Sequence, residues 1–307
     1  MNKNRTLIAS TGLLLVAFVW GSTFVLVQQA VSILPPFSFN FLRFFLAGLL
    51  LFLLYLFGRR SRSFDYSILF PGIVLGFFLF LGFGLQTIGL LHTTPARAGF
   101  ITGLNVVIVP FLALSFSKKR PSLFAICGAF FAAVGLYLLA AISSNQVQLG
   151  DILVLGCAVA FAAHIFLTDR FAAIHSALLL AAIQLLSASL FSFVSMLLFE
   201  DSSLLRNVDV LKQPEVFSGI LITALFATAA AFFLQTWAQQ FTSSTRVAVI
   251  FAMEPVFAAL SSFLLIGEVL SAKQIIGCLF IFFGMMIVEI KPKSKSWLHR
   301  RDNFFSS

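Results

Sequence analysis

The amino-acid sequence predicts an all-α membrane protein in which ten transmembrane helices form two inverted five-helix repeats. Three observations favour this fold class. The 307 residues are 60% hydrophobic and only 10% charged, with a mean hydropathy of +1.04, whereas soluble domains carry roughly 25% charged residues. The apolar residues gather in ten long segments. The two halves of the chain also repeat each other in a fixed register.

Each apolar segment is close to the roughly 20 residues that a helix needs to cross the hydrocarbon core. The segments are apolar on all sides, unlike the alternating strands of a membrane β-barrel. The first is longer than the core of a signal peptide, so we expect it to be retained as a helix. The expected spans are 7–29, 37–57, 68–91, 98–117, 122–142, 150–169, 177–199, 215–237, 246–266 and 273–290.

The distribution of lysine and arginine predicts that both termini are cytoplasmic. With the N-terminus inside, fifteen of the twenty cationic side chains lie on the cytoplasmic side. This bias obeys the positive-inside rule, and an even number of spans returns the C-terminus to the same side. We therefore expect a multi-pass protein of the cell (inner) membrane. The five cations outside the cytoplasmic set are Arg43, Arg97, Arg206, Lys212 and Lys273.

An internal repeat is the most informative feature of the sequence. When the chain is shifted by 149 residues, Leu85-Gln86-Thr87 falls on Leu234-Gln235-Thr236. The first two helices match better at an offset of 141, where Arg43 meets Gln184. Other pairs at the offset of 149 are Arg97 with Arg246, Ile101 with Ile250, Ser122 with Ser271, Gly128 with Gly277, and Gly135 with Gly284.

Five helices per repeat is an odd number, so the second copy enters the membrane from the opposite side. Inverted repeats of this kind are typical of secondary transporters, whose substrate site lies near the midplane between the halves. The predicted units are a first repeat at 1–145, a second at 146–291, and a basic cytoplasmic tail at 292–307.

Three short motifs resemble the EamA family of the drug/metabolite transporter superfamily. Trp20-Gly21-Ser22-Thr23-Phe24 resembles the opening of its first helix, and Leu42-Arg43-Phe44 resembles its second-helix signal. Glu254-Pro255-Val256-Phe257, followed by Gly267-Glu268, resembles a pattern in its ninth helix. The resemblance covers nearly the whole chain as two EamA-like units. It implies a ten-helix secondary carrier of amino acids and other metabolites, often an exporter.

The first repeat departs from the family pattern. Asn105-Val106 stands where the second repeat has Glu254-Pro255, and the proline of the first repeat comes later, at Pro110. Lys118-Lys119 replaces Gly267-Glu268. The Gly-Glu turn is therefore not a requirement of both halves.

Polar side chains inside apolar segments are the candidate functional residues, because a charge at the centre of a membrane helix costs roughly 2.5–3.5 kcal/mol. Glu254 leads this set. It lies well inside the ninth segment, and Pro255 frees a backbone carbonyl one turn earlier. Its carboxyl group could bind a proton or a substrate amine. The alternative is a structural ion pair.

Arg97 and Asn105 stand in the same relation in the fourth segment as Arg246 and Glu254 in the ninth. The two arginines could pair with a substrate carboxylate at opposite mouths of the protein. Alternatively, both are interfacial arginines whose long side chains reach the headgroups. Thr102 shares a helix face with Asn105.

The remaining candidates are two amides, two tryptophans, one threonine hydroxyl, one arginine and one histidine. Gln86 and Gln235 could bind a zwitterion or join neighbouring helices. The candidates for a cavity wall are Trp20 and Thr23, which share a face of the first helix, and Trp237, which could instead belong to an interfacial belt. For Arg43 we favour a structural role, and for His164 a satisfied core histidine over a proton relay.

The sequence predicts no cofactor, no metal and no nucleic-acid partner. It lacks a phosphate-binding loop, an HExxH motif and paired cysteines, and its cations lie in loops between spans. We expect a secondary transporter of small polar metabolites such as amino acids, acting as an exporter by alternating access. Its expected partners are the lipid bilayer, the substrate and possible coupling protons, and it is a monomer or homodimer. Two rivals are a non-transporting assembly factor and an intramembrane enzyme acting on a lipid-linked substrate, for which Asp169, Arg170 and His175 form the nearest constellation.

Overall fold

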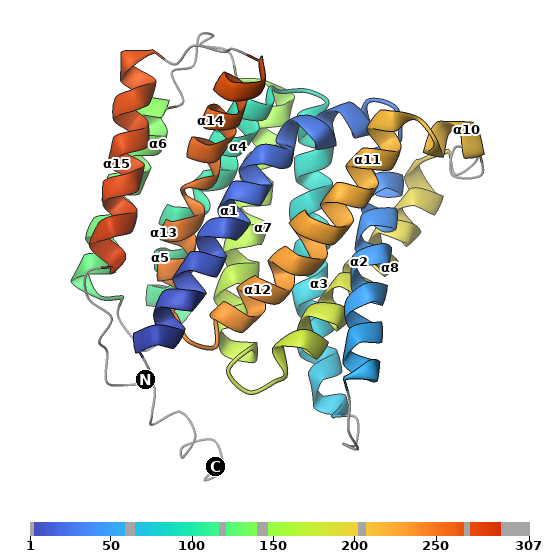
Figure 1. Cartoon of the computed structure of the whole chain (residues 1–307), viewed down its shortest axis with the longest axis horizontal. Helices are drawn as coiled ribbons and strands as arrows, with labels where there is room; N and C mark the ends of the chain where they lie inside the picture. Colours follow the sequence, from blue (N-terminus) through green and yellow to red (C-terminus); the bar gives the residue numbers. More distant parts are fainter. Residues whose placement is uncertain are drawn as a thin grey trace.

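A computed structural model describes residues 3–58, 65–116, 121–139, 147–201, 207–266 and 271–289, and these residues form a bundle of helices without strands (Figure 1). Large apolar side chains cover its outside. Phe57 is 85% exposed and Phe199 is 75% exposed. Such a surface is unfavourable in water and suits contact with lipid, so the all-α membrane fold class is confirmed.

The first half of the chain supplies five spans. They are α1 (Lys3–Val31), α2 (Pro36–Phe57), η1 with α3 (Tyr66–Ile68 and Leu69–Leu90), α4 with α5 (Pro95–Gly103 and Asn105–Phe116), and α6 (Leu123–Leu139). α6 has 17 residues and is the shortest of the expected spans among the described helices, whereas the other four are long and apolar enough to cross a membrane.

The second half repeats this order. Its spans are α7 (Leu149–Phe171), α8 (Ala177–Phe199), α11 with η2 and α12 (Pro214–Ile222, Thr223–Ala230 and Ala231–Ala238), α13 with α14 (Ser244–Phe251 and Glu254–Ile266), and α15 (Ala272–Glu289). A short helix, α10 (Val208–Leu211), precedes α11. The element η2 is a π-helix, and its counterpart α3 is a regular α-helix.

The crossing of α6 and α15 shows the inversion directly. A methyl group added at Gly128 would lie 2.7 Å from the Gly284 carbonyl oxygen, and one added at Gly135 would lie 2.6 Å from the Gly277 carbonyl oxygen. Gly128, the first glycine of α6, therefore meets Gly284, the last of α15, and Gly135 meets Gly277. Because these helices are repeat equivalents, they run antiparallel and their backbones are in direct contact, which only glycine permits.

The fourth and ninth spans are broken at equivalent places. α4 ends at Gly103 and α5 begins at Asn105, while α13 ends at Phe251 and α14 begins at Glu254. Pro255 has no amide hydrogen to donate to the carbonyl of Phe251, so the helix cannot continue through it undisturbed. Asn105 and Glu254 are the first residues of the second half of each broken span.

Candidate functional site

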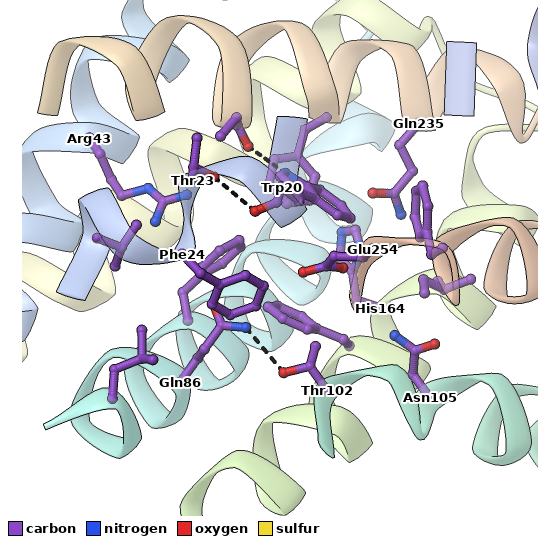
Figure 2. Close-up of a pocket in the computed structure, with 18 residues that line it drawn as sticks. Trp20, Thr23, Phe24, Arg43, Gln86, Thr102, Asn105, His164, Gln235 and Glu254 are labelled. Carbon is purple, nitrogen blue, oxygen red and sulfur yellow. Dashed lines mark hydrogen bonds between the residues drawn. The ribbon is translucent and has the colours of Figure 1, made fainter. Parts of the chain in front are cut away.

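A cavity lies between the two repeats, with about 590 Å³ of empty space that is partly open to its surroundings. It takes residues from α1, from the third and fourth spans and their counterparts in the second half, and Arg43 from α2. The lining side chains are those of Trp20, Thr23, Phe24, Val27, Arg43, Phe83, Gln86, Leu90, Thr102, Asn105, Phe161, His164, Ile165, Ala227, Phe232, Gln235, Phe251 and Glu254 (Figure 2).

The lining follows the internal repeat. Seven pairs of lining residues are equivalents at the offsets of 141 and 149. They are Trp20 with Phe161, Thr23 with His164, Phe24 with Ile165, Phe83 with Phe232, Gln86 with Gln235, Thr102 with Phe251, and Asn105 with Glu254. The cavity lining therefore has the same internal pseudo-symmetry as the two halves of the chain, as expected for an inverted repeat.

Nine of the twelve candidate residues line this cavity, and Glu254 is the acidic one. Its side chain makes no hydrogen bond or ion pair with a residue that the structure describes, although it is only 7% exposed. Figure 2 shows it near the middle of the cavity that His164 and Trp20 also line. A buried carboxyl group without a fixed partner is free to exchange a proton or a ligand.

The first-helix motif holds α1 against the broken ninth span and the π-helix. The Trp20 indole Nε1 donates a hydrogen bond of 2.7 Å to the Ala227 carbonyl in η2. A methyl group on Gly21 would collide with the Glu254 carbonyl oxygen and lie 2.8 Å from the Ala258 nitrogen. The hydroxyls of Ser22 and Ser261 are 3.0 Å apart. The motif thus positions one wall of the cavity.

Arg43 occupies the opposite side of the cavity from Gln235 in Figure 2. Its Nε and Nη2 donate to the Thr228 hydroxyl at 3.2 and 3.1 Å, and its guanidinium lies 4.4 Å from the centre of the Phe83 ring. No acidic side chain among the described residues pairs with it. The predicted structural role is consistent with these contacts, but the guanidinium also faces the cavity.

His164 belongs to a chain of polar side chains behind the cavity wall. Its Nε2 lies 2.8 Å from the Gln184 Oε1, and the Gln184 Nε2 donates to the Thr236 hydroxyl at 3.1 Å. Gln184 is the repeat equivalent of Arg43. The histidine is thus hydrogen-bonded as a core residue, and it also lines the cavity.

The two equivalent glutamines are held differently. The Gln86 Nε2 donates to the Thr102 hydroxyl at 3.2 Å, within the first repeat. The Gln235 Nε2 donates to the Gln239 Oε1 at 3.2 Å, and the Gln239 Nε2 donates to the Ile165 carbonyl at 2.8 Å.

Arg97 and Arg246 do not line the cavity. Arg97 forms an ion pair with Asp151, its Nε lying 3.1 Å from Oδ1. Arg246 pairs with Glu289, with Nε 2.8 Å from Oε1, and also donates to the Ser10 hydroxyl at 3.2 Å. Each arginine therefore joins helices outside the cavity, and pairing with a substrate carboxylate remains only a prediction.

Trp237 also lies outside the cavity and packs against the Phe241 ring, with 5.2 Å between the ring centres. The sequence reasoning missed the apolar walls and the supporting partners Asp151, Glu289, Thr228 and Gln239. The repeat register offered one usable signal, since it pairs Phe83 with Phe232 and places Gln184 opposite Arg43. Gly267-Glu268, Lys118-Lys119 and the tail at 292–307 lie outside the described residues.

Two members of the constellation considered for the rival enzyme have contacts with other residues. His175 lies 3.6 Å from Asp65, while the Arg170 guanidinium lies 4.6 Å from the centre of the Phe166 ring. Among the described residues no three His, Cys, Asp or Glu side chains gather in a way that could hold a metal ion.

Comparison with known proteins agrees with this architecture. The model of the EamA-like transporter family matches the chain twice, over residues 7–141 and 148–290. The chain belongs to the EamA-like transporter family. The family match and the broken, antiparallel equivalents described above agree on two repeats within one membrane bundle.

Two relatives carry transporter names. An "Uncharacterized transporter" of Archaeoglobus fulgidus is 36% identical over 287 residues, covering 94% of this chain and 87% of the relative. The "Uncharacterized transporter YyaM" of Bacillus subtilis is 23% identical over 276 residues, covering 87% and 88%. A protein of known crystal structure shares the fold, with a TM-score of 0.76, 20% identity, and coverage of 94% of this chain and 98% of that one. The protein is therefore a multi-pass membrane transporter and not an enzyme.

Proposed function

We propose that this EamA-family protein is a secondary transporter that exports small polar metabolites, such as amino acids, by alternating access. The observation that carries the proposal is the cavity between the repeats, in which Glu254 and its equivalent Asn105 begin the second halves of two broken spans. Broken helices at the interface of inverted repeats are the usual location of transporter binding sites.

The symmetry of the lining supports alternating access. If the two repeats exchange their conformations, a cavity open on one side becomes a cavity open on the other, and the same residues still line it. A small polar solute can then meet the amides, the hydroxyls and Glu254 in both states. Glu254 is proposed to bind a proton or the substrate, and the resemblance to the family favours export.

The proposal extends to placement in the cell. The two units are proposed at 1–145 and 146–291, followed by the basic tail at 292–307, with both termini on the cytoplasmic side of the inner membrane. The lysine and arginine distribution supports this orientation. The partners are the bilayer, a small solute and coupling protons.

Transport by purified protein in liposomes tests the proposal. Radiolabelled amino acids should move down an imposed solute or proton gradient with no ATP in the buffer, because the sequence contains no phosphate-binding loop. Empty liposomes provide the baseline. A strict requirement for ATP, or no movement of any tested small polar solute under either gradient, would reject a secondary carrier.

A further inference from the structure

Gln235 presents an unsatisfied oxygen at the cavity wall. The residue is 1% exposed, and its Oε1 has no hydrogen-bond partner among the described residues. Buried polar side-chain atoms are nearly always paired, so an unpaired acceptor needs a specific explanation. Figure 2 shows the oxygen of this amide turned toward the part of the cavity that holds Glu254. The missing partner is a hydrogen-bond donor.

The direction of the Gln235 amide is fixed from outside the cavity. The Ile165 carbonyl can only accept, so Gln239 must turn its Nε2 toward it and its Oε1 toward Gln235. Gln235 must then use its own Nε2 to donate to that oxygen, which leaves Oε1 for the cavity. Rotating the Gln235 amide by half a turn would set two oxygens against each other.

Among the described residues, the first repeat has none that fixes the direction of its glutamine amide in this way. Leu90 is the equivalent of Gln239, and it has no polar atom in its side chain. Gln86, the equivalent of Gln235, instead donates to Thr102. The orientation of the second-repeat amide is therefore a particular property of the Gln235 side of the cavity, not a general consequence of the repeat.

The surroundings of the free oxygen suit a cation that carries N–H groups. The Glu254 carboxylate lines the same cavity and is an acceptor without a partner among the described residues. The Trp20 ring centre lies 4.9 Å from that of Phe251 and 5.5 Å from that of Phe232, and all three rings line the cavity. Aromatic faces attract cations, and charge-assisted hydrogen bonds are the stronger ones.

We propose that the cavity recognises its solute through a primary or secondary ammonium group held between Glu254 and the Gln235 oxygen. Gln239 acts as the positioning residue that makes Gln235 an acceptor there. This inference rests on the proposed transport function and names the chemical group that its substrate carries. The rings next to the ammonium group receive the apolar part of the solute.

The test compares binding of three probes to the detergent-purified full-length protein by isothermal titration calorimetry. The probes are 2-phenylethylamine, 2-phenylethanol and the N,N,N-trimethyl derivative of the amine. The amine should bind about 10-fold more tightly than the alcohol, because a charged donor makes the stronger hydrogen bonds. The trimethyl derivative should bind more weakly than the primary amine, because it keeps the charge but has no N–H group.

Two variants test whether Gln235 and Gln239 cause the preference for the amine over the alcohol. Gln235→Met removes the acceptor, and Gln239→Leu introduces the first-repeat residue and releases the amide. Each should lower the ratio of amine to alcohol affinity by about fivefold, the size of one hydrogen bond. Gln240→Leu is the matched control, because the Gln240 Nε2 donates to the Ala172 and His175 carbonyls away from the cavity. It should keep the wild-type ratio.

A ratio of affinities within one variant does not depend on how much of the sample is folded. Equal binding of amine and alcohol to the wild-type protein, or tighter binding of the trimethyl derivative than of the amine, would overturn the inference. So would a wild-type ratio in Gln239→Leu. Because these measurements need no gradient, their failure leaves the ATP-independent transport experiment to decide the proposed function separately.

Discussion

Asp151 and Ser10 occupy equivalent positions in the two repeats, and each contacts the arginine at the start of the broken span in the other repeat. Asp151 pairs with Arg97, and the Ser10 hydroxyl accepts from Arg246. The charge that neutralises Arg246 comes instead from Glu289, within the same repeat. The contact between repeats is therefore an ion pair at one arginine and a hydrogen bond to a neutral hydroxyl at the other.

The ion pair of Arg97 with Asp151 is expected to be structural. Its side chains are 15% and 9% exposed, so Arg97→Gln or Asp151→Asn alone leaves a poorly solvated charge and should cost about 2 kcal/mol of stability. The double variant should lose less than the sum of the two. Thermal unfolding in detergent measures this, and transport should keep its KM. A KM raised by Arg97→Gln for carboxylate substrates only would instead identify this arginine as a substrate ligand.

Two glycines of α1 should respond oppositely to the same substitution. Gly21→Ala places a methyl group against the Glu254 carbonyl and 2.8 Å from the Ala258 nitrogen. The overpacking should cost about 1–3 kcal/mol, with reduced transport because the broken ninth span is displaced. Gly12→Ala is the control, since its methyl group would meet only the Leu234 Cδ2 at 3.8 Å. It should be neutral or stabilising by up to about 1 kcal/mol. Equal melting temperatures for the two variants would contradict this packing.

The carboxylate of Glu254 is expected to couple transport to a gradient. Glu254→Gln keeps the size and hydrogen bonding of the side chain but cannot exchange a proton, so proton-driven accumulation in liposomes should be lost. Folding should survive, because a neutral amide is cheaper in the membrane than a charge. Substrate exchange down its own gradient moves no net proton, so it should persist at saturating substrate, with a raised KM because the ammonium group loses its charged partner.

The equivalent residue in the first repeat provides the control for this experiment. Asn105→Ala should weaken substrate binding and keep the pH dependence of transport. If Glu254→Gln transports at the wild-type rate with unchanged pH dependence, the coupling role is wrong and the side chain is structural.

The proposed orientation predicts the results of reporter fusions. An alkaline phosphatase fusion after Lys293 should be inactive and a fluorescent-protein fusion there should be bright, because the C-terminus is expected in the cytoplasm. Fusions near Asn145, between the repeats, should give the reverse pattern. A cytoplasmic position for Asn145 would be incompatible with five spans before it and a cytoplasmic N-terminus.

The sequence predicted the spans and much of the cavity because both follow from the cost of polar groups in lipid. Asn105, Gln86 and Glu254 stand out in apolar segments for that reason, and all three line the cavity. The partners of the arginines were harder to predict. Asp151 and Glu289 lie near the ends of their helices, where a carboxylate needs no special explanation.

The apolar walls could not be identified because the chain contains 40 phenylalanines. Phe83 and Phe232 face the cavity while Phe57 faces outward, and hydropathy is the same for each. The π-helix at Thr223–Ala230 also contains no residue type or motif that would predict it from the sequence. Its Ala227 carbonyl and Thr228 hydroxyl accept hydrogen bonds from Trp20 and Arg43, which are tertiary contacts that a local sequence pattern does not reveal.

The contact of Gly21 with the Glu254 carbonyl has a consequence for the surrounding lipid. At this crossing the α1 backbone lies against α14 with no room for even one methyl group. An acyl chain, which is at least as wide as a methylene group, cannot pass between the two helices there. The carboxylate that begins α14 is thus sealed from the hydrocarbon along this line, so a charge can reside beside the bilayer core without contacting it.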